Sequence, residues 1–293
     1  MNPDPLNVIL TAVALLGGIA LVLAVGLVLA DSKLRVVEDP RFDAVEGMLP
    51  GNNCGACGFP GCRAFSTALV GGEASPAACS VSDDAGRERI AAFLGVDVGQ
   101  RQKVVARLAC AGGVNVARQR ARYEGLPSCR AAAAVGGGGK SCAWGCLGLA
   151  DCEKVCDFDA ITMDANGLPV VDEDLCTACG ACVEVCPKQL FELHPVDHRL
   201  WVACRNLEAG EEVLEGCEVG CTACGRCAMD APGGLVAMRG NLPVVDYAKD
   251  HDTRAPIERC PTGAIVWQGP RGPEKGRESK KVLRKNPLPP AAT

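Results

Sequence analysis

The chain has 293 residues, a formal net charge of −5 and an apolar content of 48%, which suit a folded protein of two domains with one membrane segment. Aromatic residues make up only 4% of the chain, so cores built mainly from large side chains are excluded. Twenty cysteines are present instead, and cysteine use this heavy indicates disulfides, zinc sites or iron–sulfur clusters. We expect no nucleic-acid partner.

Residues 6–30 contain no charge over 25 positions and predict a transmembrane helix. At about 1.5 Å per residue, such a helix exceeds the roughly 30 Å hydrocarbon core of a bilayer. A cleaved signal peptide is the weaker alternative, because no basic region precedes the apolar run and no Ala-x-Ala-like cleavage site ends it.

Basic residues on one side of this helix predict its orientation. Only Asp4 precedes the helix, whereas Lys33, Arg35 and Arg41 follow it. The chain is therefore expected to cross the plasma (inner) membrane once, with its cysteine-rich body on the cytoplasmic side. Because that compartment is reducing, we interpret the cysteines as metal ligands rather than as disulfides.

After the anchor (residues 1–30), a compact domain is expected at 31–95, and it contains GNNCGACGFPGC at 51–62. The glycines allow tight loops that direct backbone N–H groups at sulfur. We predict one [4Fe–4S] cluster here, with a zinc site as the alternative. Its four ligands are Cys54, Cys57, Cys62 and Cys79.

A connecting segment is expected at 96–140, and it ends in a glycine run within AVGGGGKS at 134–141. This run meets a relaxed phosphate-loop pattern. It follows an alanine run and abuts Cys142, however, whereas a phosphate loop joins a strand to a helix. We interpret it as a linker.

A dicluster domain is expected at 141–200, where CxxCxxCxxxCP is the run of bacterial ferredoxins in which the fourth cysteine ligates the other cluster. A partner run with looser spacing precedes it. This crossover rule assigns one [4Fe–4S] cluster to Cys142, Cys146, Cys152 and Cys186. It assigns a second cluster to Cys176, Cys179, Cys182 and Cys156. Paired zinc sites give no reason for three successive cysteines followed by Cys-Pro.

An internal repeat extends the pattern into a degenerate module at 201–268. Residues 160–176 (AITMDANGLPVVDEDLC) and 234–250 (GLVAMRGNLPVVDYAKD) each predict a strand, a tight turn and a second strand. The second copy has lost all four ligands of one cluster, at Ala231, Asp250, Thr253 and Pro256. It keeps a complete set at Cys221, Cys224, Cys227 and Cys260.

The remaining cysteines are Cys110, Cys129, Cys204 and Cys217. Two interpretations stay open, a fifth [4Fe–4S] cluster or four plain buried thiols. The tail at 269–293 is rich in Pro, Lys and Arg without apolar periodicity, and we predict that it is disordered.

The order of these features resembles the B subunit of the Rnf ion-translocating electron-transport complex, in its long form, over about residues 6–268. The most specific stretches are GNNCGACGFPGC, KSCAWGCLGLADCEKVCDFDAI at 140–161 and CTACGACVEVCPK at 176–188. Asp157 departs from the proline usual at that position, which affects a potential rather than a ligand. The expected architecture is α+β: a single N-terminal transmembrane helix, a small helical [4Fe–4S] domain, then ferredoxin-like βα modules.

The resemblance implies that electrons pass between soluble ferredoxin and NAD through several membrane subunits while sodium ions or protons cross the membrane. This chain would be the subunit at which electrons enter on the cytoplasmic side, with the other Rnf-type membrane subunits and membrane lipid as partners. The nicotinamide and its flavin would lie on another subunit, so no catalytic residue is expected on this chain. The alternatives are an electron donor that keeps a redox-sensing transcription factor reduced, and a non-redox zinc scaffold.

Overall fold

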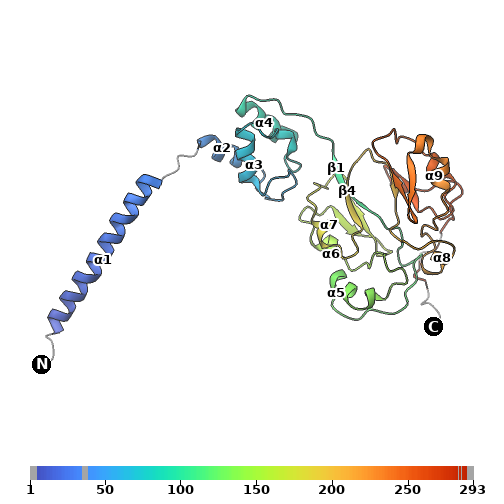
Figure 1. The fold of residues 1–293 in the computed structure, drawn as a ribbon, viewed down its shortest axis with the longest axis horizontal. Helices are drawn as coiled ribbons and strands as arrows, with labels where there is room; N and C mark the ends of the chain where they lie inside the picture. The colour runs from blue at the N-terminus through green and yellow to red at the C-terminus, as the bar shows by residue number, and fades with distance from the viewer. Residues whose placement is uncertain (1–4, 35–38, 283, 285, 289–293) are drawn as a thin grey trace.

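The computed structural model describes residues 5–34, 39–282, 284 and 286–288 as a mixture of helices and strands. The helix α1 (Pro5–Leu34) extends away from the folded body (Figure 1). Within the described residues it is the one helix long and apolar enough to cross a membrane, over Ile9–Lys33. Its large apolar side chains are exposed, as contact with lipid requires. Asp4 and Arg35, on which the predicted orientation depends, lie outside the described residues.

A small helical unit follows α1. It consists of α2 (Pro40–Met48), α3 (Cys62–Val70), a 3-10 turn (Pro76–Ala78) and α4 (Asp84–Leu94). The Asp83 side chain accepts a hydrogen bond from the Gly86 N–H at 2.8 Å and caps α4. Val45, Phe65 and Ile90 form the buried core of the unit, and Cys79 packs with them.

Two β-hairpins confirm the strands predicted from the internal repeat. The first pairs β2 (Ile161–Met163) with β3 (Pro169–Val171), and the second pairs β6 (Val236–Arg239) with β7 (Leu242–Val245). Two short helices accompany each hairpin: α6 (Asp151–Lys154) and α7 (Ala181–Val185) for the first, α9 (Arg226–Asp230) and α10 (Ala255–Glu258) for the second. The two copies therefore share one local architecture.

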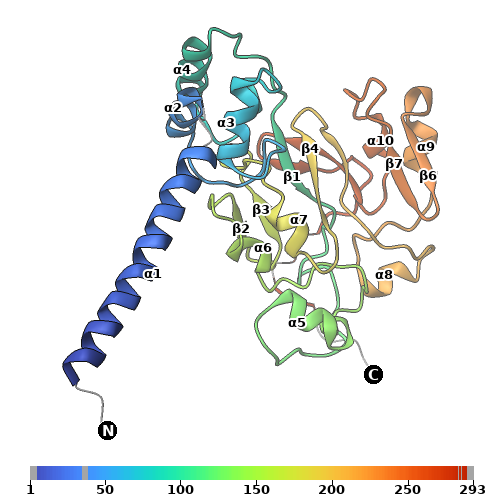
Figure 2. The ribbon, with the colours of Figure 1, turned by 60° about the vertical axis from the view of Figure 1, so that its left-hand side comes forward.

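The two copies lie side by side in Figure 2. The remaining strands connect them to each other and to the connecting segment that precedes the first copy. β1 (Val104–Leu108) pairs antiparallel with β4 (Phe191–Pro195). β5 (Leu200–Val202), β8 (Ile265–Gly269) and β9 (Gly272–Glu274) form a second sheet in that order. The Trp201 indole N–H donates to the Leu108 carbonyl at 2.8 Å and links the two sheets. The connecting segment thus contributes a strand to the folded body.

Cysteines take part in the cores of both copies. In the first, Cys152 and Cys182 are buried with Ile161 and Phe191. In the second, the core contains Leu200, Leu235, Ile257, Ile265 and Trp267 together with Cys204, Cys221, Cys227 and Cys260. This placement accounts for a folded chain with few aromatic residues.

The glycine run between α5 (Cys129–Ala134) and Cys142 forms a tight turn at Gly136–Gly139. All four glycines have positive φ, from 57° to 81°, a region that favours glycine. A side chain at Gly139 would collide with the Ala121 carbonyl, and the Gly139 carbonyl accepts a hydrogen bond from the Arg120 N–H at 2.7 Å. The run therefore joins two packed segments.

The C-terminal segment differs from the predicted disordered tail as far as it is described. β9 pairs with β8, and Arg277 contacts Glu258 at 2.8 Å. The Glu218 carboxylate forms ion pairs with Lys280 at 3.4 Å and with Arg284 at 3.2 Å. These basic side chains find acidic partners on the folded body, which composition alone does not reveal.

Candidate cluster-binding sites

Three small cavities are each bordered by four cysteines. Set A consists of Cys54, Cys57, Cys62 and Cys79. Set B consists of Cys156, Cys176, Cys179 and Cys182. Set E consists of Cys221, Cys224, Cys227 and Cys260. These three groupings are the ones that the spacing predicts. All twenty cysteines lie in the described residues as free thiols.

The loop that carries set A depends on its glycines and on Asn53. Gly55, Gly58 and Gly61 have φ values of 72°, 87° and 117°. The Asn53 side-chain oxygen accepts a hydrogen bond from the Cys62 N–H at 2.8 Å, at the start of α3. This bond closes the loop and directs its cysteines toward the buried Cys79.

Sets B and E share a second kind of loop, Cys-Thr-Ala-Cys-Gly-x-Cys, at 176–182 and 221–227. The alanines at its third position, Ala178 and Ala223, have φ values of 59° and 56°. The following glycines, Gly180 and Gly225, also have positive φ and precede α7 and α9. One local conformation therefore presents three sulfurs to one point in both copies.

The structure groups the other eight cysteines differently from the prediction. A fourth small cavity is bordered by Cys110, Cys142, Cys204 and Cys217, here called set D. Burial, and then the thiolates of Cys129 and Cys186, raise the pKa of Cys152 to about 12. Cys129 therefore takes the place that was expected for Cys142. Burial, and then the thiolates of Cys110 and Cys129, raise the pKa of Cys146 to about 12, so Cys146 also lies near Cys129. We call Cys129, Cys146, Cys152 and Cys186 set C.

Long-range backbone pairing brings Cys142 to set D. The segment around Arg118 lies between the segments that contain Ser141 and Gly216. The Ser141 N–H donates to the Arg118 carbonyl at 3.0 Å, and the Arg118 N–H donates to the Gly216 carbonyl at 3.0 Å. Cys142 and Cys217, the next residues along these outer segments, therefore face the same cavity.

An acidic side chain brings Cys129 to set C. The Asp151 carboxylate accepts hydrogen bonds from the Ser128 hydroxyl at 2.8 Å and from the Arg130 N–H at 3.1 Å. These two donors flank Cys129, and Asp151 immediately precedes Cys152. The start of α5 is thereby held beside the rest of set C.

Neighbouring N–H groups donate to the cysteine sulfurs, as in proteins that bind iron–sulfur clusters. The Gly112 and Cys146 N–H groups reach the Cys110 sulfur, both at 3.4 Å. The Asn206 and Cys221 N–H groups reach the Cys204 sulfur at 3.5 and 3.3 Å. Such donors favour the thiolate form.

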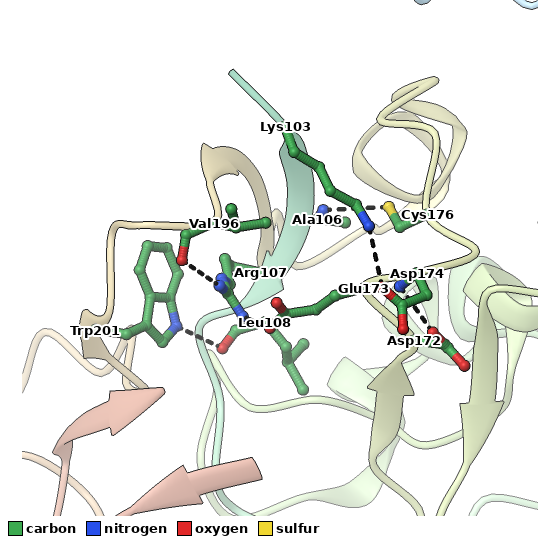
Figure 3. Close-up of polar contacts among 10 residues, drawn as sticks. All are labelled: Lys103, Ala106, Arg107, Leu108, Asp172, Glu173, Asp174, Cys176, Val196 and Trp201. Carbon is green, nitrogen blue, oxygen red and sulfur yellow. Dashed lines mark hydrogen bonds and ion pairs between the residues drawn. The ribbon is translucent and has the colours of Figure 1, made fainter. Parts of the chain in front are cut away.

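Strand β1 contributes to set B in the same way (Figure 3). The Ala106 N–H donates to the Cys176 sulfur at 3.4 Å. On either side of Ala106, Arg107 forms a close ion pair with Glu173, and Lys103 pairs with Asp174 at 3.2 Å. The two ion pairs hold the Cys176 loop against the strand.

Sequence analysis missed a set of basic residues beside the sulfurs. Lys140 is 5% exposed and borders the set D cavity, where its ammonium donates to the Gly112 and Cys146 carbonyls. Arg101 donates to the Ala78 carbonyl at 3.0 Å, next to Cys79. The only signal in the sequence is that Lys140 lies two residues before Cys142. Positive charge here compensates thiolates that are removed from water.

Burial dominates the acid–base behaviour of these cysteines. It raises the pKa of Cys204 and Cys217 to about 12, and neighbouring thiolates add to the increase. In set E it raises the pKa of Cys221 and Cys227 to about 11. Buried thiols of this kind are protonated at neutral pH unless a metal takes the place of the proton.

The five sets form a linear series. Set A adjoins set B, because Cys54 lies near Cys179. Burial of Cys54 is the main cause that raises its pKa, and the Cys179 thiolate adds to the increase. Sets B and C adjoin because Cys182 and Cys186 lie at the two ends of α7. The Cys146 N–H bond to Cys110 joins set C to set D, and the Cys221 N–H bond to Cys204 joins set D to set E.

The donor set fits iron–sulfur clusters. Four sulfurs border each of four similar cavities, the surrounding lining is mainly apolar, and N–H groups point at sulfur. Clusters of the [4Fe–4S] type take four thiolates. Cys224 of set E is the exposed member among the twenty cysteines, whereas the other three cysteines of that set are buried.

Comparison with known proteins agrees with this chemistry. Residues 49–81 match a family model described as a putative Fe–S cluster, and residues 169–190 match a 4Fe–4S binding domain. The chain is 39% identical over 260 residues to the B subunit of the Na⁺-translocating ferredoxin:NAD⁺ oxidoreductase complex of Acetobacterium woodii, covering 89% of this chain and 78% of that protein.

Two further relatives extend over most of both chains. The B subunit of the ion-translocating oxidoreductase complex of Methanosarcina acetivorans is 34% identical, covering 88% of this chain and 98% of its own length. The B subunit of the proton-translocating ferredoxin:NAD⁺ oxidoreductase complex of Clostridium ljungdahlii is 36% identical, covering 89% and 93%. None of these three names refers to a transcription factor.

Proposed function

The chain belongs to the B-subunit family of ion-translocating oxidoreductase (Rnf) complexes, and from this premise we propose that it accepts electrons from ferredoxin and relays them through five [4Fe–4S] clusters. The observation that carries the proposal is the linear series of five cysteine sets. Sets B and C meet at the two ends of α7, hydrogen bonds join set C to set D and set D to set E, and sets A and B are linked by the electrostatic interaction of Cys54 with Cys179.

The proposed ligands are all twenty cysteines, four to a cluster. Sets A, B and E follow the predicted grouping, whereas sets C and D exchange Cys129 and Cys142 relative to it. Around the first hairpin, sets B and C correspond to a ferredoxin-like pair with a crossed fourth ligand. Around the second hairpin, set E is the remaining half of such a pair.

A bound [4Fe–4S] cluster supplies one-electron oxidation and reduction without bond making on the protein. The residues of the chain hold the sulfurs, exclude water and set the local charge. Lys140 and Arg101 place positive charge beside sets D and A. The N–H groups of Ala106, Gly112 and Leu190 donate to sulfur in sets B, D and C.

The two ends of the series differ in what can reach them. Set E contains the exposed Cys224, which suits contact with a soluble ferredoxin. Set A belongs to the helical unit that follows α1, which suits transfer toward membrane subunits of the same complex. We propose that α1 spans the membrane next to lipid and those subunits, and that the body faces the cytoplasm.

Metal analysis tests the cofactor. Iron, acid-labile sulfide and zinc are measured on anaerobically purified full-length protein. About twenty iron and twenty sulfide ions per chain are expected from five clusters of four. Stoichiometric zinc with little iron would overturn the proposal.

Rapid mixing with reduced ferredoxin tests where electrons enter. Bleaching of visible absorption is followed in the wild type, in Cys221→Ala/Cys227→Ala, which removes set E, and in Cys54→Ala/Cys57→Ala, which removes set A. Loss of set E is expected to slow reduction of the remaining clusters, whereas loss of set A leaves the rate unchanged. The opposite result would mean that electrons enter at set A.

A further inference from the structure

The three histidines of the chain lie together, outside the cysteine sets. His194 belongs to β4, His198 lies in the turn before β5, and His251 lies in the loop after β7. Tyr247 stacks on His198 with ring centroids 3.8 Å apart and an interplanar angle of 5°. The His251 ring stands edge-on to both, 5.1 Å from His198 and 5.4 Å from Tyr247. Two segments about fifty residues apart thus meet through imidazoles.

Hydrogen bonds leave one nitrogen lone pair free on two of these imidazoles. The Nδ1 atom of His251 lies 3.0 Å from the Lys249 carbonyl, which only accepts, so Nδ1 carries the proton and Nε2 carries the lone pair. The Nε2 atom of His194 lies 3.1 Å from a Glu192 carboxylate oxygen, so it donates there. Its Nδ1 then accepts from the Nδ1 of His198 at 3.0 Å, which leaves Nε2 of His198 with its lone pair.

This arrangement matches the surroundings of metal-binding histidines, whose second ring nitrogen donates to a carbonyl, a carboxylate or another group that fixes the tautomer. Burial lowers the pKa of His194 and of His198, whereas the Asp197 carboxylate acts in the opposite direction on His198.

A carboxylate completes the group. One ligand atom each from Asp197, His198 and His251 lie within 4.8 Å of one another. One Asp197 oxygen accepts a hydrogen bond from the Gln102 amide at 2.6 Å, which orients the carboxylate and leaves its other oxygen available. Asp197 is exposed and the two histidines are half-buried, so the site is open to solvent on one side.

We propose that Asp197, His198 and His251 bind one divalent transition-metal ion of the zinc class, with water in the remaining position. Two imidazoles and one carboxylate are a ligand set typical of zinc with an open coordination position. Such an ion would tie the turn between β4 and β5 to the loop after β7, and so fix the two copies relative to each other. The site contains no cysteine and is independent of the electron-transfer proposal.

Equilibrium dialysis of the cluster-loaded, full-length protein against Zn²⁺ tests the site, with iron and zinc measured in the same sample. The expected result for the wild type is about one zinc ion per chain with unchanged iron. His198→Gln and His251→Gln are each expected to weaken binding at least about tenfold, as loss of one ligand implies. Asp252→Asn, which alters the exposed acid next to His251 outside the ligand group, should bind like the wild type.

A positioning variant keeps the test meaningful if a histidine variant folds poorly. Glu192→Gln retains all three ligands but weakens the acceptor that fixes the tautomer of His194 and His198, and such changes cost about 10–100-fold in metal affinity. Electron paramagnetic resonance of bound Co²⁺ in the oxidised protein gives a second readout.

Three results would overturn the proposal. The first is equal zinc binding by the wild type and both histidine variants. The second is no binding by the wild type at about 1 mM zinc, a concentration at the weak end of specific affinities. The third is zinc uptake that is matched by loss of iron. The last result would place zinc at the cysteines.

Discussion

The exchange of Cys129 and Cys142 between sets C and D can be tested with paired alanine variants. Two alanines in one set remove one cluster, whereas two alanines in different sets remove two. The structure places Cys110 with Cys142, so Cys110→Ala/Cys142→Ala should lose about four of twenty iron ions. The grouping predicted from spacing separates this pair, and with a fifth cluster at Cys110, Cys129, Cys204 and Cys217 it requires a loss of about eight.

A reciprocal pair provides the matched control. Cys129→Ala/Cys152→Ala should also lose about four iron ions, because both residues belong to set C. Cys142→Ala/Cys152→Ala should lose about eight, although the spacing rule places both in one cluster. Iron and sulfide are measured on anaerobic samples, with clusters counted by Mössbauer spectroscopy. A loss of about four iron ions from Cys142→Ala/Cys152→Ala would refute the structural grouping.

Three further outcomes follow from the environment of the sulfurs. Lys140→Met removes a buried positive charge beside set D and should lower the reduction potential of that cluster by more than about 60 mV. For one electron, this shift is a tenfold change in the equilibrium constant of reduction. A redox titration that shows an unchanged potential would contradict this prediction. Burial raises the pKa of Cys204 and Cys217 to about 12, so protons compete with metal for these sulfurs below that pH. A chelator should therefore remove iron faster as the pH falls, by up to about tenfold per thiol per pH unit. Ile257→Ala opens the core next to Cys260 and should lower the free energy of unfolding by about 2–5 kcal/mol in denaturant titrations, with iron lost from set E alone.

Local spacing predicts the sites whose ligands come mostly from one loop. The Cys-Thr-Ala-Cys-Gly-x-Cys loops and the loop that begins at Cys54 present three sulfurs within a few residues. The crossover rule locates the fourth ligand of set B, the internal repeat locates that of set E, and Cys79 is the next cysteine after the Cys54 loop. The hairpins follow from the same repeat. These features depend on short-range geometry, which a sequence contains.

Sets C and D depend instead on contacts between distant segments. Cys142 and Cys129 both precede Cys146, and spacing cannot distinguish them. The pairing of Arg118 with Ser141 and Gly216, and the bonds from Ser128 and Arg130 to Asp151, decide the outcome. The described part of the C-terminal segment differs from the prediction for a related reason, since its basic side chains pair with Glu218 and Glu258 elsewhere on the chain.

The second copy shows what fills the positions at which the first copy carries the predicted ligands of one cluster. Ala231, at the position of a lost ligand, packs against the apolar core that contains Leu235 and Ile257. Pro256, at another such position, is itself buried. Apolar packing thus fills positions that cysteines occupy in the first copy. Because Cys227 and Cys260 belong to that same core, the core also holds set E in place without the cysteines of a second set.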